Sequence, residues 1–434
     1  MSRQKGVEMN RARIMSGIVV SLSVAGIVCA YQPDPEKSDG VAGVWQQETL
    51  TGGFWGLNDQ LADKGIELAL STTQIYQQNV RGGTSTHRRA GRLSGSYDLE
   101  LSADLRKLAG VPAARLYMLT EGSFSNGIDE ASVGSFFGVN GDAAGERSMD
   151  ITELWFEKAF ADQTLYVRIG KLDLTGGFEH HGCPVSFDCI RYANDENTQF
   201  LNSALVNNPA IPFPDNGLGV AVHYSPQHLW YVSAAVADAQ ADIRETGLAT
   251  TFHDEDYLFW IFETGLTPHL NSANGPLQGA YRLGLWYDPQ DKEEFVTGKT
   301  RRDDKGFYLS FDQMLYKENS DAEDTQGLGV FGRYGWAGSK VNEVTNFWSL
   351  GVQYQGLLPD RDDDVLALGF AQGIFSNRAV DFTEDYEAVW ELYYSAQVTP
   401  WLAVSPSIQY VANPGGDRTV GDAVVLGLRA LISF

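Results

Sequence analysis

The chain has 434 residues, a formal net charge of −24, 46 glycines and only 3 cysteines, and 12% of its residues are aromatic. Such an excess of acidic side chains repels nucleic acid and argues against a nucleic-acid partner. After residue 30, no apolar run approaches the roughly 18 residues that a membrane-spanning helix needs. Many aromatic residues and glycines are typical of an all-β protein with many turns. They also suit a transmembrane β-barrel, whose polar lumen dilutes its apolar residues.

Residues 1–30 have the pattern of a secretory signal peptide. Basic residues up to Arg13 precede an apolar stretch, Ile14–Val28, and small residues follow at the expected cleavage site. We therefore expect an exported protein. Residues 31–64 then predict a periplasmic leader, which is polar and proline-rich at first and contains a short helix over residues 54–63.

From residue 65 onward, apolar and polar residues alternate in segment after segment. In residues 93–106 every second residue is apolar or small, whereas a helix of this sequence would spread its apolar residues all round. The last segment, Ala423–Phe434, also alternates and would pair with the first to leave no open edge. We predict an all-β fold, a transmembrane antiparallel β-barrel of about 16 strands over residues 65–434, with a short N-terminal helical segment before strand one. The predicted strands are 65–79, 93–106, 113–124, 151–160, 164–174, 217–225, 228–238, 257–267, 279–288, 305–316, 327–337, 346–357, 364–374, 386–399, 401–411 and 423–434.

The connections between these segments are sorted by length. The short links 161–164 and 399–401 follow even-numbered strands, whereas the long connections 80–92, 125–150 and 175–216 follow odd-numbered ones. Outer-membrane barrels have short periplasmic turns and long extracellular loops. A soluble β-sandwich, the alternative fold, has no reason to sort its loops by strand parity.

Several stretches resemble the OprB family of carbohydrate-selective porins. They are residues 50–66 (LTGGFWGLNDQLADKGI), 97–110 (YDLELSADLRKLAG), 153–170 (ELWFEKAFADQTLYVRIG), 199–203 (QFLNS) and 387–434, which contains ELYYSAQVTPWLAVSPSIQYVANPGG. The resemblance implies a sixteen-stranded channel for mono- or oligosaccharides in the outer membrane of a Gram-negative-type bacterium. Its partners would be small carbohydrates and outer-membrane lipid, and no cofactor is implied. A single barrel and a homo-oligomer such as a trimer both stay open.

The long connection 175–216 carries an insert, CPVSFDC, that departs from the family pattern. Because Cys29 would leave with the signal peptide, Cys183 and Cys189 predict a disulfide in an exported loop. His180 and His181 raise the alternative of an outer-membrane enzyme, but adjacent histidines do not share a face of a strand or helix. We favour a polar loop that folds into the lumen or caps its mouth, and we assign no catalytic or metal-binding residue.

Strand parity predicts which side chains face the lumen. The turn at 161–164 pairs residues whose numbers sum to 325, which sets Glu157 opposite Arg168 and Trp155 opposite Gly170. Asp312, Tyr393, Gln397 and Gln409 are inward by the same parity rule. The predicted substrate-binding or pore-lining residues are Arg115, Glu121, Glu153, Trp155, Glu157, Arg168, Arg282, Glu391 and Arg429.

These residue types suit a sugar channel. Charged and amide groups can replace the water around sugar hydroxyls, and aromatic faces can stack on the apolar face of a pyranose ring. Transport needs weak contacts at several sites, because tight binding would stall release. The competing interpretation is that lumen charges pair across strands and only stabilise the wall. We therefore predict passive, carbohydrate-selective diffusion. The alternatives are a general, cation-preferring porin, an outer-membrane enzyme and a secreted β-rich binding protein.

Overall fold

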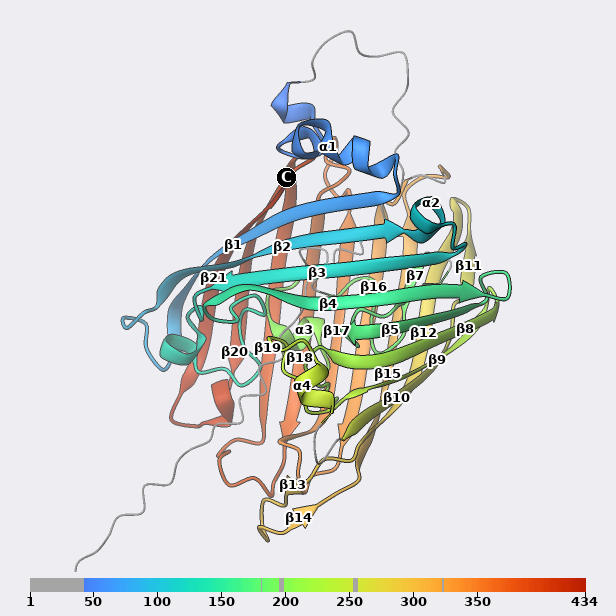
Figure 1. The fold of residues 1–434 in the computed structure, drawn as a ribbon. Helices are drawn as coiled ribbons and strands as arrows, with labels where there is room; N and C mark the ends of the chain where they lie inside the picture. Colours follow the sequence, from blue (N-terminus) through green and yellow to red (C-terminus); the bar gives the residue numbers. More distant parts are fainter. Residues whose placement is uncertain (1–42, 181, 195–198, 253–256, 322–323) are drawn as a thin grey trace, which may run out of the picture.

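The computed structural model describes residues 43–180, 182–194, 199–252, 257–321 and 324–434. They form a closed barrel of 16 long antiparallel strands (Figure 1). The predicted signal peptide and the first part of the predicted leader, residues 31–42, lie outside the described residues. Among the described residues, no helix is both long enough and apolar enough to cross a membrane.

The sixteen predicted strands correspond one to one with the strands of the barrel. These are β1 (Ile66–Gly83), β2 (Gly91–Asp104), β3 (Ala114–Phe124), β4 (Arg147–Phe160), β5 (Leu165–Leu172), β8 (Gly217–Gln227), β9 (Trp230–Asp238), β10 (Leu258–Leu266), β12 (Gly275–Asp288), β15 (Asp304–Lys317), β16 (Gly327–Ala337), β17 (Val344–Gln355), β18 (Val365–Phe375), β19 (Tyr386–Thr399), β20 (Leu402–Ala412) and β21 (Gly421–Ser433). β1 pairs with both β2 and β21, which closes the barrel.

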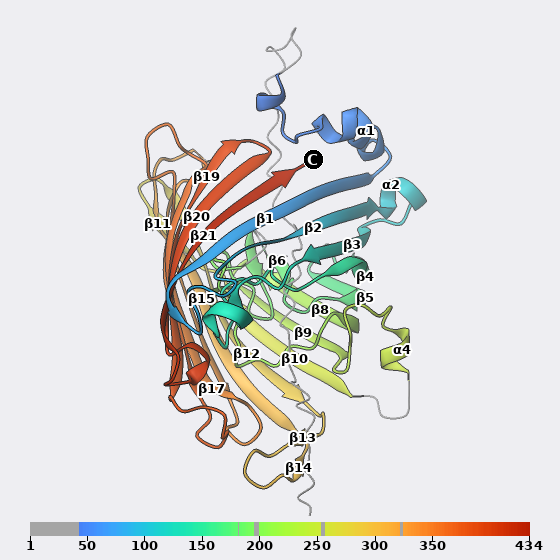
Figure 2. The same ribbon diagram turned by 90° about the vertical axis from the view of Figure 1, so that its left-hand side faces the viewer.

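Short elements decorate the barrel or lie inside it. The short strands are β6 (Phe178–His180), β7 (Cys183–Val185), β11 (His269–Ser272), β13 (Lys292–Glu293) and β14 (Thr300–Arg301). The helices are η1 (Val44–Gln46), α1 (Gly52–Ala62), α2 (Leu105–Ala109), η2 (Asp129–Val133), α3 (Ser203–Val206), α4 (Leu248–Thr251) and η3 (Pro414–Gly416). The short helix predicted over residues 54–63 corresponds to α1, although residues Gly53–Gly56 of α1 have left-handed backbone angles. α1 lies at the same end of the barrel as the C terminus (Figures 1 and 2).

Several strands run further than their alternation predicts. β12 begins at Gly275 because its first four residues pair with β11 in a hairpin. β1 continues to Gly83, where it still pairs with Gly421 through a register shift. At these ends the backbone hydrogen bonds between strands continue after the apolar alternation has stopped. The sequence pattern therefore underestimates the length of these strands.

The predicted register between β4 and β5 is confirmed. Glu157 lies opposite Arg168, and Trp155 lies opposite Gly170. Three consecutive residues of the turn, Ala161–Gln163, have φ between 50° and 65°. Such a tight turn fixes the register, because a slip of one residue would move every side chain of β5 to the other face.

The lumen is filled in part by the chain itself. The described parts of the connections 125–146 and 173–216 contribute buried side chains that pack against inward wall residues. Phe137, Phe200 and Leu205 from these connections pack with inward wall residues such as Phe331 and Phe347 in one apolar cluster. The long loop that the sequence placed either in or over the lumen therefore folds inward.

Candidate functional site: the lumen wall and its inner loops

Three glutamates of the wall bind backbone N–H groups of the inner loops. Glu391 on β19 accepts hydrogen bonds from the N–H groups of Leu201 and Asn202, both at 2.9 Å. Glu263 on β10 accepts from the N–H groups of Ser186 at 2.8 Å and Asp188 at 3.1 Å. A buried carboxylate is stable only when such donors replace its water, so both carboxylates fix the loop that contains these amides.

Glu263 and Glu387 have further donors. The hydroxyls of Tyr231 and Tyr308 donate to Glu263 at 2.5 and 2.7 Å. Glu387 on β19 holds the other inner loop, since it accepts from the N–H groups of Phe136 at 2.7 Å and Phe137 at 3.2 Å. Each wall glutamate therefore binds a turn of backbone, as a helix N-cap carboxylate does.

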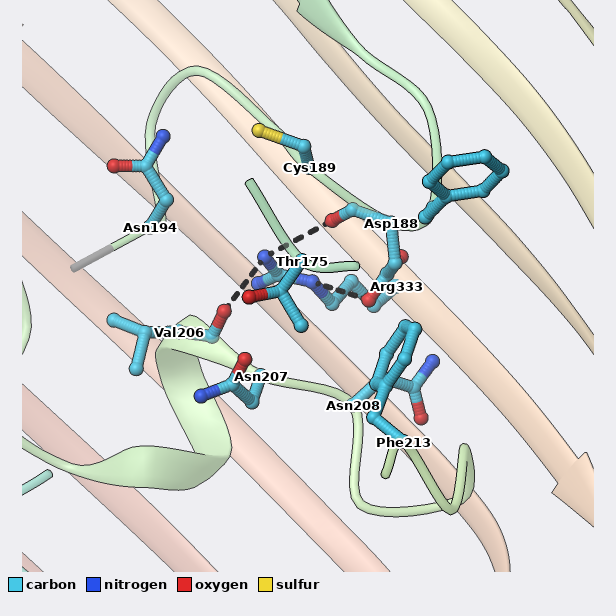
Figure 3. A pocket seen from close by; sticks show the side chains of 10 residues that line it. Thr175, Asp188, Cys189, Asn194, Val206, Asn207, Asn208, Phe213 and Arg333 are labelled. Carbon is cyan, nitrogen blue, oxygen red and sulfur yellow. Dashed lines mark hydrogen bonds and ion pairs between the residues drawn. The ribbon is translucent and has the colours of Figure 1, made fainter. Parts of the chain in front are cut away.

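Arg333 on β16 binds the inner loop 173–216 by donating hydrogen bonds to backbone carbonyl groups of that loop (Figure 3). Its Nε lies 2.9 Å from the carboxylate of Asp188, and its Nη atoms donate to the carbonyls of Leu205 at 2.8 Å, Ala193 at 2.6 Å and Val206 at 3.0 Å. Burial raises the pKa of the Asp188 carboxyl to about 6, although the Arg333 charge opposes that rise. We call Glu263, Arg333, Glu387 and Glu391 the loop anchors.

Arg282 and Arg429, both predicted to line the pore, also bind the inner loop. Arg282 forms an ion pair with Asp312 at 2.7 Å and donates to the carbonyl of Pro184 at 2.6 Å. Arg429 donates to the carbonyl of Gln199. The predicted inward orientation agrees with these contacts, but the structure gives these arginines a loop to bind where the sequence predicted contact with solute.

The predicted disulfide between Cys183 and Cys189 is wrong in this structure. Both cysteines are buried and no bond joins them. The sulfur of Cys183 lies 4.0 Å from the carbonyl oxygen of Gly279 on β12, whereas Cys189 lines a small pocket beside Arg333. The turn Ser186–Asp188 between them has φ values of 58° to 79° and is bound by a loop anchor. It directs the two thiols toward different parts of the wall.

His180 is buried against the wall. Its Nε2 lies 3.2 Å from the carbonyl oxygen of His228, and its ring packs edge-on against the ring of His223 with centroids 5.6 Å apart. His181 lies outside the described residues. His180 therefore serves to pack the β6–β7 hairpin against β8 and β9.

A second group of predicted residues gathers on β3, β4 and β5. Glu157 lies between two arginines, 2.9 Å from Arg168 and 3.4 Å from Arg115. Both guanidinium groups lie over the ring of Trp155, at 4.2 Å and 4.9 Å from its centroid. The ring of Trp155 also stacks with the ring of Tyr117, with centroids 4.7 Å apart. We call these five residues the Arg115 cluster.

Exposure within the Arg115 cluster is uneven. The side chain of Arg115 is 42% exposed, whereas Trp155 is 4% exposed. Trp155 is covered by its neighbours, so it supports the guanidinium planes and does not offer a free ring face. Glu153 accepts a hydrogen bond from the indole N–H of Trp155 at 2.9 Å and fixes the ring. Glu121 is buried and lies opposite Asp98 in the register.

Three loop anchors, Glu263, Arg333 and Glu387, were not among the predicted pore-lining residues. Each is an inward charge on a predicted strand, so the parity rule that selected Arg282 would have included them. Their role depends on which loop backbone reaches them, and no pattern within a single strand carries that information.

A closed sixteen-stranded barrel with a charged lumen narrowed by inner loops is the architecture of a porin-type channel. Residues 88–434 match the family described as carbohydrate-selective porin, OprB family. The chain belongs to this family, whose function is the passive passage of carbohydrates. Family and fold imply a Gram-negative outer-membrane protein.

Individual relatives agree with this assignment. The chain is 25% identical to Porin B of Pseudomonas aeruginosa over 89% of this chain and 91% of that protein. It is 23% identical to the putative porin QuiX of Acinetobacter baylyi over 90% of this chain and 94% of that protein. The high-pH structure of Pseudomonas putida OprB superposes with a TM-score of 0.78 at 22% identity, covering 91% of this chain and all of that one.

Proposed function

We propose that carbohydrates cross the barrel by passive diffusion along a path that includes the Arg115 cluster. One observation supports the choice of these residues. The partly exposed guanidinium of Arg115 lies beside the carboxylate of Glu157, with Nη2 and Oε1 3.4 Å apart. Together they offer hydrogen-bond donors and acceptors in one place, as sugar hydroxyls require.

The supporting residues make this surface rigid. Arg168 donates to Glu157 through two nitrogens at 2.9 and 3.1 Å and to the carbonyl of Gly177 at 3.1 Å. Its guanidinium is therefore already committed to the wall and the inner loop. Only the exposed edge of Arg115 and the remaining acceptor capacity of Glu157 are left for solute. Few contacts give weak binding, which passive transport needs.

Liposome swelling tests the proposal directly. Wild-type protein should admit neutral sugars faster than amino acids of matched size, and Arg115→Gln should reduce that advantage. Sugars that pass no faster than size-matched amino acids through the wild-type channel would refute carbohydrate selectivity. An unchanged advantage in the Arg115→Gln variant would refute only the role of the Arg115 cluster.

A cation-preferring general porin is the second candidate, because the chain has a net charge of −24. Focused negative charge raises the local concentration of cations. The reversal potential across a planar bilayer with a salt gradient distinguishes the two functions when it is combined with the swelling rates. Strong cation preference without any preference for sugars would favour this second candidate.

We also propose that residues 1–30 direct export, that residues 31–64 form a periplasmic leader and that the barrel is surrounded by outer-membrane lipid. No catalytic activity is part of the proposal. Membrane fractionation tests the location, since extraction into aqueous buffer without detergent would rule it out. Mass measurement in detergent distinguishes a single barrel from a homo-oligomer.

A further inference from the structure

The segment before the barrel is fastened to the barrel wall. The indole N–H of Trp401 donates to the carbonyl of Val44 at 2.8 Å, and the N–H of Leu50 donates to the carbonyl of Ser433 at 2.8 Å. Asn58 on α1 accepts a hydrogen bond from the N–H of Leu68 at 3.1 Å. These contacts hold the segment at the end of the barrel where the C terminus lies (Figures 1 and 2).

α1 lies where the barrel wall would otherwise have an open strand edge. The pairing between β1 and β21 begins at Ser71 and Ser433, so the first residues of β1 extend beyond β21. The N–H of Leu68 in this extension is satisfied by Asn58. Covering an exposed edge with a helix is a common way to protect unpaired backbone groups. The segment therefore covers the edge of β1 that β21 leaves unpaired.

The apolar residues of this segment are unusually exposed. Trp55 is 85% exposed and Trp45 is 66% exposed, and Leu57 is also exposed. At 100° per residue, Leu57 and Leu61 lie on one side of the wall-binding Asn58. Asp59 lies on the opposite face of the helix from both leucines, so this part of α1 has an apolar face and an acidic face.

The backbone around Trp55 is held in an unfavourable conformation. Residues Gly53–Gly56 all have φ between 54° and 79°, and this left-handed turn includes Phe54 and Trp55. A residue with a side chain is disfavoured in this region, because its Cβ comes too close to the following carbonyl oxygen. Two threonine hydroxyls support the turn, Thr49 by accepting from Gly53 N–H at 2.7 Å and Thr51 by accepting from Phe54 N–H at 3.0 Å. Strain that is supported in this way marks a position where the placement of a side chain matters.

The part of the wall next to α1 is apolar on its outer face. The outward residues of β1 next to α1 are Ile66, Leu68 and Leu70, so the apolar outer face of the barrel continues up to the helix. The inward residue Glu67 is polar. Tryptophan prefers the boundary between acyl chains and headgroups, where its ring is apolar and its N–H is solvated.

We propose that Trp45, Trp55 and the Leu57–Leu61 side of α1 insert into the headgroup region of the periplasmic leaflet and anchor the closing edge of the barrel to the lipid. The proposal rests on the outer-membrane location and is independent of which solute passes. It assigns the leader segment a partner, the phospholipid surface, beside its contacts with β1 and β21.

Fluorescence quenching in proteoliposomes tests the proposal. The difference between the emission of wild-type protein and Trp55→Phe gives the signal of Trp55. It should be quenched by phosphatidylcholine brominated near the headgroup end of its acyl chains, and only weakly by aqueous acrylamide. Trp390→Phe is the matched control, because Trp390 is an outward residue of the lipid-facing belt.

A Trp55 signal that is quenched by acrylamide but not by brominated lipid, while Trp390 is quenched by lipid, would overturn the proposal. Trp45→Phe gives a second difference spectrum in case the first variant assembles poorly. If the Trp390 signal also fails to respond to brominated lipid, the outer-membrane location fails instead. The two failures are therefore distinguishable.

Discussion

The loop anchors and the Arg115 cluster contain the same residue types on the same inner face of one barrel. The loop anchors bind the inner loops, whereas the Arg115 cluster leaves a charged side chain exposed to the lumen. Around Glu263, Arg333, Glu387 and Glu391, the inner loops supply the hydrogen-bond partners and exclude water. In the Arg115 cluster the partners come mainly from neighbouring strands, with one further bond from Arg168 to the carbonyl of Gly177, and the Arg115 side chain stays partly exposed. An inward charge becomes a structural anchor or a solute contact according to what covers it.

Replacing Arg333 should have the largest effect on this comparison. Arg333→Met removes the hydrogen bonds that the guanidinium donates to the carbonyls of Ala193, Leu205 and Val206. It also leaves the buried Asp188 carboxylate without the Arg333 cation. Removal of one partner of a buried ion pair costs about 3–5 kcal/mol. We expect a detached inner loop, a higher single-channel conductance and proteolysis within residues 173–216.

Arg115→Met is the matched control, because it removes the same charge from the Arg115 cluster. It should leave the loop protected from protease. Normal conductance and normal protection in Arg333→Met would show that the loop does not depend on its anchor.

Glu391→Gln should have a smaller effect. The amide keeps one acceptor for the N–H groups of Leu201 and Asn202 but turns an NH₂ group toward one of these donors. Hydrogen bonds to a charged group are worth about 1.5–3 kcal/mol each. We expect frequent brief openings in single-channel records. Glu384→Gln makes the same chemical change at the surface and should record as wild type, and indistinguishable records from both variants would contradict the anchor role.

Acidification should strengthen the attachment of the inner loop. With the loop in place, burial raises the pKa of Asp188 to about 6, above its ordinary value of 3.8. The docked loop therefore binds more protons at Asp188 than a displaced one does between these values. The contribution of Asp188 to the stability of the docked loop is fully present below pH 3.8 and is lost as the pH rises through 6. As the pH falls from about 6.5 to about 4, single-channel openings should therefore become rarer. Asp188→Asn should flatten this change, and an equally steep profile in that variant would assign it to another group.

The sequence predicted the barrel well because its evidence is local. The alternation in residues 93–106 and the sum rule across the turn 161–164 depend on neighbouring residues. The sum rule describes the register correctly, and the alternation is correct as far as Asp104, after which Leu105 and Arg106 begin α2. The same rule could not separate Arg115 from Arg282, since both face inward. Their difference arises from long-range contacts, such as the carbonyl of Pro184 that reaches Arg282. The disulfide prediction failed for the same reason, because spacing along the chain ignores the wall contacts of the turn Ser186–Asp188.

Trp155→Leu should have the smallest effect and tests the other side of the comparison. The ring lies under the guanidinium groups of Arg168 and Arg115 without offering a free face. The cation–π contact with the exposed guanidinium of Arg115 is worth about 0.5–1 kcal/mol, so the sugar flux should fall by about fivefold or less, while ion conductance stays near wild type. Trp286→Phe, at a buried inward tryptophan outside the cluster, is the control for general damage to the wall. Equal losses of sugar flux in both variants would mean that Trp155 only fills space. A selective loss in Trp155→Leu would show that the ring orients the arginines along the solute path.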